Sequence, residues 1–311
     1  MTTSNRQEFD TQLASRHRKS RIFAKLCAMS TWVGVAALFV LLVGVTIKGW
    51  GWLNLDFLRN FDSRHPEQAG VLAGIWGSFW LILFTTLITV PVGVGAAIYL
   101  EEFAPKNAFT RLIQVNLANL AGVPSIVYGI LGLTLFVRFL HLERSVVSGA
   151  LTLSLLILPV VIMASQEALR AIPPSLRHAS LSLGATPWQT VRHQVLPAAL
   201  PGIMTGVILA ISRAIGETAP LIMIGALTFV AFTPGDIETP VDLVTKPDGV
   251  AMAPLDTFTA LPIQIYNWVS QPEAEYQHVA AAGILVLLAV LLFLNAAAIF
   301  IRHRYQIQNR W

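Results

Sequence analysis

Charged residues are scarce in this chain: Asp, Glu, Lys and Arg make up 12% of its 311 residues, whereas soluble globular proteins carry about 25%. Hydrophobic residues make up 55%, and the mean hydropathy is +0.64. This balance indicates a protein whose solvent is lipid. The formal net charge of +4 says little by itself, because in a membrane protein the placement of charge matters more than its sum. We expect no nucleic-acid partner.

Cysteine is limited to Cys27, which excludes an internal disulfide and a metal site built from several cysteines. None of the five lysines lies in the G-x-x-x-x-G-K-[ST] pattern of a nucleotide-binding loop, and there is no H-E-x-x-H zinc motif. The sequence also has no G-x-S-x-G nucleophile motif in a suitable context. We therefore expect no enzyme activity, no metal site and no cofactor in this chain.

Six apolar stretches are long enough to cross the hydrocarbon core of a bilayer, which takes roughly 20 residues of α-helix. They lie at about 26–47, 72–100, 112–140, 146–165, 200–232 and 279–301. The sequence therefore predicts an all-α, polytopic membrane protein with six transmembrane helices.

Basic residues are distributed unevenly between the segments that connect these stretches. With the N-terminus in the cytoplasm, fourteen Lys and Arg fall on the cytoplasmic side and six outside, and Arg213 lies within a stretch. The positive-inside rule favours this orientation, which also places the C-terminus in the cytoplasm. The predicted parts are a cytoplasmic tail (1–25), an anchor with an outer loop (26–71), a core (72–301) with a cytoplasmic loop (166–199) and an outer loop (233–278), and a second tail (302–311).

The two long loops are predicted to contain short helices. In the cytoplasmic loop, Pro174 and Pro187 stand where the first turn of a helix tolerates proline. In the outer loop, segment 261–268 carries aromatic residues typical of the membrane interface. The outer loop has seven acidic residues against Lys246 alone, a balance that suits docking of a protein rather than attraction of a free anion.

The cytoplasmic loop resembles the loop signature of ABC-importer permeases, which reads E-A-A, three residues, Gly, nine residues, Ile, one residue, Leu-Pro. Matching residues are Ala179, Gly184, Leu196 and Pro197, while His178 replaces the usual Glu, Ser180 stands at the second Ala and Gln194 replaces the usual Ile. The resemblance implies a coupling helix, bounded by Gly184 and Pro197, that docks on an ATPase subunit. An ordinary amphipathic helix at the membrane surface is the alternative.

The fifth stretch carries the charged run Ser212-Arg-Ala-Ile-Gly-Glu-Thr-Ala-Pro220. At 1.5 Å per residue, Arg213 is expected about 20 Å into the stretch, near the bilayer centre, with Glu217 one turn later on the same face. Such a charge costs at least a few kcal/mol and normally faces the protein interior or a water-filled path. We therefore predict a substrate path along Ser212, Arg213, Gly216, Glu217 and Thr218. A purely structural ion pair is the alternative, although apolar residues would serve that purpose at lower cost.

The run from Arg213 to Leu221 resembles the signature of phosphate-specific permeases of the PstA and PstC kind, and 121–129 also resembles this family. Features before the last stretch, within 261–277, favour the PstA type. The resemblance covers about residues 70–301. It implies import of inorganic phosphate by alternating access in a bacterial or archaeal inner membrane, together with a PstC-type permease, two PstB-type ATPase subunits and a PstS-type phosphate-binding protein.

Two other functions remain open from the sequence. One is an ABC permease for another oxyanion or small solute. The other is an ATP-independent secondary carrier, which usually has broken helices in two corresponding halves of the chain. No such duplication is visible in the sequence.

Overall fold

A computed structural model describes residues 4–308. This part of the chain is helical without a named strand, and a single antiparallel bridge joins Ser145 to Thr257. The helices that build the candidate spans are α1 (Ser4–Gly49), α3 (Leu72–Ile98), α4 (Ala108–Ala121), α5 (Ser125–Gly132), α6 (Val146–Arg170), α9 (Leu196–Gly216) and α14 (Glu275–Gln308). The predicted all-α membrane fold is confirmed: five helices are long and apolar enough to span a membrane, and the pair α4 and α5 makes a sixth, bent span.

Shorter helices fill the connections between these spans. They are α2 (Leu55–Arg59), α7 (Pro174–Ser182), α8 (Pro187–Thr190), α10 (Ala219–Ile224), α11 (Asp242–Thr245), α12 (Pro247–Met252) and α13 (Leu261–Ser270). The remaining elements are short. Three are 3₁₀ turns: η1 (Trp50–Trp52), η2 (Pro66–Gln68) and η6 (Pro234–Asp236). Three are π-helical segments: η3 (Tyr99–Phe103), η4 (Leu133–Phe139) and η5 (Val191–Val195). The helices predicted after Pro174, after Pro187 and at 261–268 are thus present as α7, α8 and α13.

Helix α6 is the centre of the bundle and packs against both α3 and α9. In its most apolar 18 residues 67% are buried, compared with 28% in α3 and 22% in α9. Close approach to α9 depends on small residues: a Cβ at Gly206 would lie 2.4 Å from the Cβ of Ala164, and one at Gly202 would lie 2.8 Å from that of Ala168. Small residues of this kind let membrane helices pack backbone to backbone.

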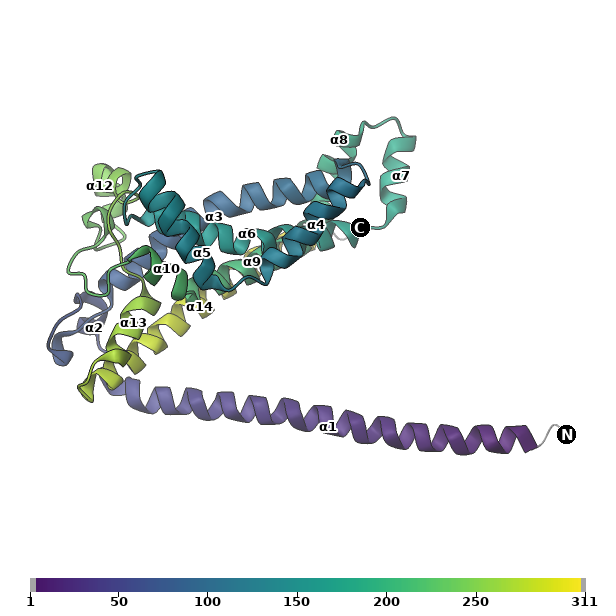
Figure 1. Cartoon of the computed structure of the whole chain (residues 1–311), viewed down its shortest axis with the longest axis horizontal. Coiled ribbons are helices and arrows are strands. Elements are labelled where there is room, and N and C mark those ends of the chain that lie inside the picture. Colours follow the sequence, from purple (N-terminus) through teal and green to yellow (C-terminus); the bar gives the residue numbers. More distant parts are fainter. Residues whose placement is uncertain (1–3, 309–311) are drawn as a thin grey trace.

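Helix α1 diverges from the bundle, and its most apolar segment is unburied (Figure 1). It meets α14 near its C-terminal end, where a Cβ on Gly49 would lie 2.7 Å from the backbone of Ala281. Leu38, Phe39 and Val40 are exposed, which is the surface expected of a helix that faces lipid or another membrane subunit.

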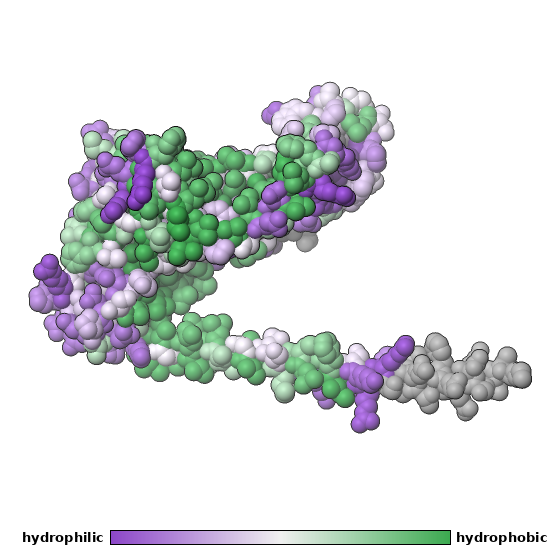
Figure 2. Space-filling view, viewed as in Figure 1, coloured by the Kyte–Doolittle hydropathy of each residue, from purple (hydrophilic) through white to green (hydrophobic). Residues whose placement is uncertain are grey.

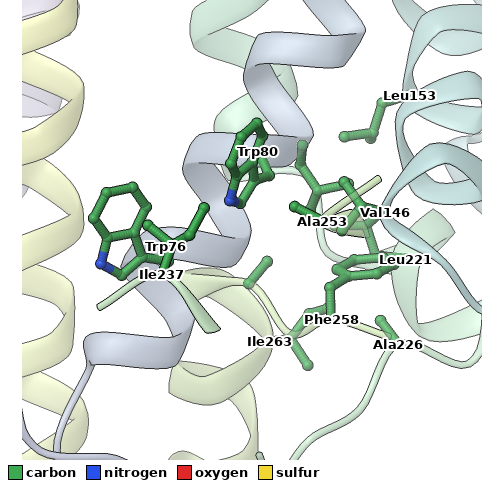
Figure 3. Packing of buried hydrophobic residues seen from close by; sticks show 12 residues of the cluster. Trp76, Trp80, Val146, Leu153, Leu221, Ala226, Ile237, Ala253, Phe258 and Ile263 are labelled. Carbon is green, nitrogen blue, oxygen red and sulfur yellow. The ribbon is translucent and has the colours of Figure 1, made fainter. Parts of the chain in front are cut away.

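Much of the outer loop is part of the core rather than a free surface. Trp76 and Trp80 of α3 pack with Val146, Leu221 and Phe258 in one buried cluster (Figure 3). The Trp76 indole Nε1 donates a hydrogen bond to the carbonyl of Glu238, 3.0 Å away, which holds the loop against α3. The segment predicted as an outer loop therefore closes one end of the bundle.

Two predicted spans are wrong in their continuity. The third, expected as one helix at 112–140, breaks at 122–124 into α4 and α5, whose axes differ by 102°. Pro124 explains the break, because a proline lacks the amide hydrogen needed to continue the helix and disfavours the helical conformation in the residue before it. The fifth, expected at 200–232, ends at Gly216, and α10 follows in a new direction.

The two ends of the bundle are hydrophilic and the middle is apolar (Figure 2). One end, which we call the α7 end, carries α7, α8 and the start of α4; the opposite end carries α2, α12 and α13 (Figure 1). The candidate site and the predicted coupling loop are separated along this axis.

Candidate functional site

The breaks in α4–α5 and α9–α10 lie against each other. Helix α5 packs on α10, and a Cβ on Gly129 would lie 2.7 Å from the Cα of Pro220, so glycine is needed for this approach. The Tyr128 hydroxyl donates a hydrogen bond of 2.8 Å to the carbonyl of Leu120, on the other side of the α4–α5 break. Interrupted helices expose backbone groups that, inside a membrane, are tolerated where protein or a water-filled path satisfies them.

Arg213 and Glu217 lie at this junction and contact each other. The Arg213 Nε donates to Glu217 Oε1 at 3.2 Å. The two residues do not share a helix face as expected, because Glu217 is the first residue after α9 and has an extended backbone. Arg213 lies three residues from the end of α9, and its side chain is 47% exposed against 18% for Glu217. The guanidinium therefore keeps hydrogen-bond donors that Glu217 does not occupy.

The remaining predicted path residues have different surroundings. Gly216 is exposed, and a Cβ there would meet nothing within 4 Å. The carbonyl of Thr218 accepts the amide of Ile222 and starts α10. Ser212 faces α14 instead: its hydroxyl is 2.5 Å from Asn295 Oδ1 and 2.7 Å from the carbonyl of Ile208.

A second polar contact joins α9 to α14 two turns away. Arg302 Nη1 donates to the Thr205 hydroxyl oxygen at 2.9 Å. Thr205 and Ser212 are seven residues apart on α9, as are Arg302 and Asn295 on α14, so the two contacts lie along one seam. This seam fixes the face of α9 that carries Arg213.

At the α7 end, Gly184 forms the turn between α7 and α8 with φ of +86°, a left-handed conformation that side chains rarely adopt. A capping box follows, in which Thr186 and Gln189 exchange hydrogen bonds and start α8. His178 and Ala179 are exposed, while the Ser180 hydroxyl lies 3.0 Å from that of Thr190.

The prediction that Pro197 breaks the helix is wrong. Pro187–Gly216 is one continuous helical span, with Leu196 and Pro197 half-buried inside it. The π-helical segment η5 lies just before Pro197. A wider π turn relieves the clash between a proline ring and the preceding turn, so the helix passes through. The loop is thus joined to Arg213 by a single helix of 30 residues, about 45 Å long.

Two acidic residues of η3 are functional candidates that the sequence analysis missed. Glu102 receives both Nε and Nη2 of Arg177, with Nη2 at 2.6 Å, and Arg177 also donates to the carbonyls of Ile172 and Leu169. Glu101 accepts from Arg170 Nε at 2.8 Å. These pairs tie α7 and the end of α6 to the end of α3. The sequence does show two adjacent acidic residues, Glu101 and Glu102, and a basic cytoplasmic loop. It does not show that they pair, because Glu102 and Arg177 lie 75 residues apart.

The surface of the loop beyond these anchors is apolar. Leu183 is 90% exposed, and Leu181 and Trp188 are also exposed. Exposed large apolar residues around a fixed turn are typical of a protein docking surface.

At the opposite end, Asp62 is a buried acidic residue with an unsatisfied oxygen. Its Oδ1 accepts from Trp268 Nε1 at 2.8 Å, while Oδ2 is buried without a hydrogen-bond partner. Burial raises the pKa of the Asp62 carboxyl above its usual range, against the opposing effect of the Trp268 hydrogen bond. Backbone amides of Thr239 and Glu238 instead lower the pKa of Asp242. Among the described residues, no group of three or more His, Cys, Asp or Glu is placed to hold a metal ion.

Comparison with known proteins gives consistent matches over most of the chain. The family described as "Binding-protein-dependent transport system inner membrane component" matches residues 89–306. The chain is 33% identical to the "Probable ABC transporter permease protein YqgI" of Bacillus subtilis, covering 85% of this chain and 88% of that protein. It is 32% identical to the "Phosphate transport system permease protein PstA" of Yersinia pestis, covering 92% of this chain and 90% of that protein.

Solved structures show the same fold at lower identity. A chain of a bacterial ABC transporter that imports the polysaccharide alginate superposes with a TM-score of 0.60 at 16% identity, covering 92% of this chain and 96% of that one. A chain of the MetNI methionine ABC transporter gives 0.57 at 16% identity, covering 76% and 95%.

Proposed function

This chain belongs to the family of binding-protein-dependent transport system inner membrane components, and on that premise we propose that it is the PstA-type permease of an ATP-driven importer of inorganic phosphate. It is thus an ABC importer permease, and an ATP-independent carrier is set aside. Several relatives of about 30% identity bear the name PstA, which supports phosphate as the substrate.

The observation that carries the proposal is the half-exposed Arg213 beside Glu217, at the junction of two broken helices. A guanidinium presents a planar fork of donors that matches the oxygens of phosphate. Glu217 engages one side of the fork and limits how tightly an anion is held. Transport needs such weak and passing contact. We assign Gly216 and Thr218 to the wall of the path, and Ser212 to positioning α9 through Asn295.

The continuous helix from Pro187 to Gly216 supports a mechanism for coupling. A force applied to the turn at Gly184 is transmitted along this helix to Arg213, because an unbroken helix is stiff along its axis. The docking surface comprises the exposed His178 and Ala179 and the apolar Leu183 and Trp188. Its partners in the proposal are the PstB-type ATPase subunits.

The proposed orientation places the α7 end and both termini in the cytoplasm, as the positive-inside rule indicates. The opposite end then faces the phosphate-binding protein. A PstC-type permease completes the path, and the unburied face of α1 is available to lipid or to that partner. The inner membrane of a bacterial or archaeal cell is the proposed location.

Replacing the charged pair tests the path. The double variant Arg213→Met with Glu217→Leu keeps similar volumes, so a merely structural pair leaves uptake nearly unchanged. If Arg213 contacts the anion, loss of a charge-assisted contact of about 1.5–3 kcal/mol lowers uptake roughly 10- to 140-fold. The measurement is uptake of labelled phosphate, normalised to assembled complex. Near-normal uptake would contradict the assignment.

A control removes two charges elsewhere. Lys19 and Arg21 are exposed on α1, away from the break and from both proposed docking surfaces, and Lys19→Met with Arg21→Met should leave uptake unaffected. Glu217→Gln tests the substrate, because protonated phosphate can donate a hydrogen bond to a carboxylate whereas sulfate cannot. The variant should discriminate less between labelled phosphate and competing sulfate. Unchanged discrimination would assign selectivity to other residues.

A further inference from the structure

A cavity of about 820 Å³ opens at the α7 end, between the end of α3, the start of α4 and the end of α6. Its walls combine two kinds of side chain. Lys106, Arg111 and Arg170 contribute positive charge, whereas Leu100, Leu112 and Val115 are apolar. Neither the path at Arg213 nor the docking surface around Gly184 includes these residues.

The positive charge in this cavity is not neutralised within the described chain. Arg170 is engaged by Glu101 at 2.8 Å and by Glu167 at 2.9 Å. Lys106 and Arg111 have no acidic partner among the described residues. Three cations and one carboxylate, Glu101, line the cavity, and with Glu167 beside Arg170 the group carries a formal charge of +1.

The apolar part of the lining continues on the surface of α4. Leu112, one turn after the start of α4, is 58% exposed, and Val115, two turns after it, is 53% exposed. A basic pocket between membrane helices, with an apolar wall beside it, suits an anionic head group whose chains remain in lipid. The same cations suit a free phosphate ion that leaves the path.

We propose that this cavity binds a phosphate group at Lys106 and Arg111, with Arg170 as its third, already paired cation. The occupant is either the head group of an anionic phospholipid or inorganic phosphate, and both present the same oxyanion. The inference rests on the cytoplasmic placement of the α7 end in the proposed function.

Occupancy has a consequence for coupling. Arg170 and Arg177 bind the adjacent carboxylates of Glu101 and Glu102. An anion that shares Arg170 therefore acts on the end of α3, next to the residue that anchors α7. The cavity and the anchor of α7 therefore meet at the adjacent residues Glu101 and Glu102.

The experiment compares Lys106→Gln with Arg111→Gln against a matched pair, Lys19→Gln with Arg21→Gln. The control removes two cations from exposed positions on α1, at the same side of the membrane and outside the cavity. Each variant is purified with its partner permease and ATPase subunits and without the phosphate-binding protein, which would bind phosphate itself. Retention of phosphatidylglycerol against excess phosphatidylcholine is counted by native mass spectrometry. Binding of labelled inorganic phosphate is measured by equilibrium dialysis.

The phosphate arm is carried out in the Arg213→Met, Glu217→Leu background, so that binding in the path does not contribute. We expect the cavity pair to weaken binding about 30-fold in one arm, since each cation near the membrane surface contributes several-fold. Loss in the lipid arm identifies the head group, and loss in the dialysis arm identifies free phosphate. Equal effects of cavity and control pairs, or no change in either arm, would overturn the proposal. Neither readout requires transport, so it stands or fails independently of the uptake test.

Discussion

Replacing Arg177 with methionine tests how α7 is held to the membrane-spanning helices. Arg177 is 21% exposed and Glu102 is 10% exposed, so this pair is largely withdrawn from solvent. Breaking a buried ion pair by removing one partner costs about 3–5 kcal/mol, because the other charge is left uncompensated. Partial exposure reduces this figure, and we expect about 2–3 kcal/mol. The carbonyls of Leu169 and Ile172 also lose their hydrogen bonds from Arg177.

Hydrogen exchange measures this cost where it acts. A loss of 2–3 kcal/mol raises the open population of α7 roughly 30- to 140-fold, and the amides of 174–182 should exchange faster by that factor. In transport assays the Arg177→Met variant should still hydrolyse ATP while phosphate uptake falls. The expected result is thus a changed ratio of uptake to hydrolysis, measured on the same vesicles.

Two further variants separate the charge pair from general disruption. Arg177→Met with Glu102→Leu removes the uncompensated carboxylate and should recover most of the lost thermal stability. Arg170→Met breaks the pairs with Glu101 and Glu167, in which the Arg170 side chain is 42% exposed and which do not involve α7, so exchange at 174–182 should stay slow. If Arg177→Met leaves this exchange unchanged, or if the double variant is as unstable as the single one, the ion pair is not what anchors α7.

Three other expectations follow from single residues. Gly184→Trp should assemble yet take up little phosphate, because the new side chain projects from an open turn onto the docking surface. Gly184→Ala is the control, since it shares the backbone strain of about 1 kcal/mol without the bulk. Normal uptake by the Trp variant would exclude docking at this turn. In a Cys27→Ala background, an impermeant thiol reagent applied to intact cells should label Thr239→Cys and not Ser182→Cys, and labelling of both would refute the orientation. Because the pKa of Asp62 is raised from its ordinary value of 3.8, the folded chain binds this proton more tightly than the unfolded chain does. The contribution of Asp62 to stability is therefore present below about pH 3.8 and is lost as the pH rises through the folded pKa. Asp62→Asn should flatten this decline in thermal unfolding measured from pH 3.8 upward, and an unchanged slope would assign it to another group.

The sequence by itself determined which segments cross the membrane and which charged residues lie within them, but not where two of the helices break. Long apolar runs predict spans because the backbone in lipid must satisfy its own hydrogen bonds, and that requirement is local. The contact between Arg213 and Glu217 was also within reach, since residues four apart meet even when the helix ends between them. The end of this helix at Gly216 was not predicted.

Only the tertiary structure decided how these elements meet. The bend at Pro124 brings α5 into contact with α10. Arg177 pairs with Glu102, which lies 75 residues away in the sequence. Ser212 meets Asn295 across 83 residues, which turns a predicted path residue toward a helix seam. Pro197 lies inside a continuous helix and follows a π-helical segment in which Val191 and Val195 are buried. Such pairings depend on which helices become neighbours, and spacing along the chain carries no information about that.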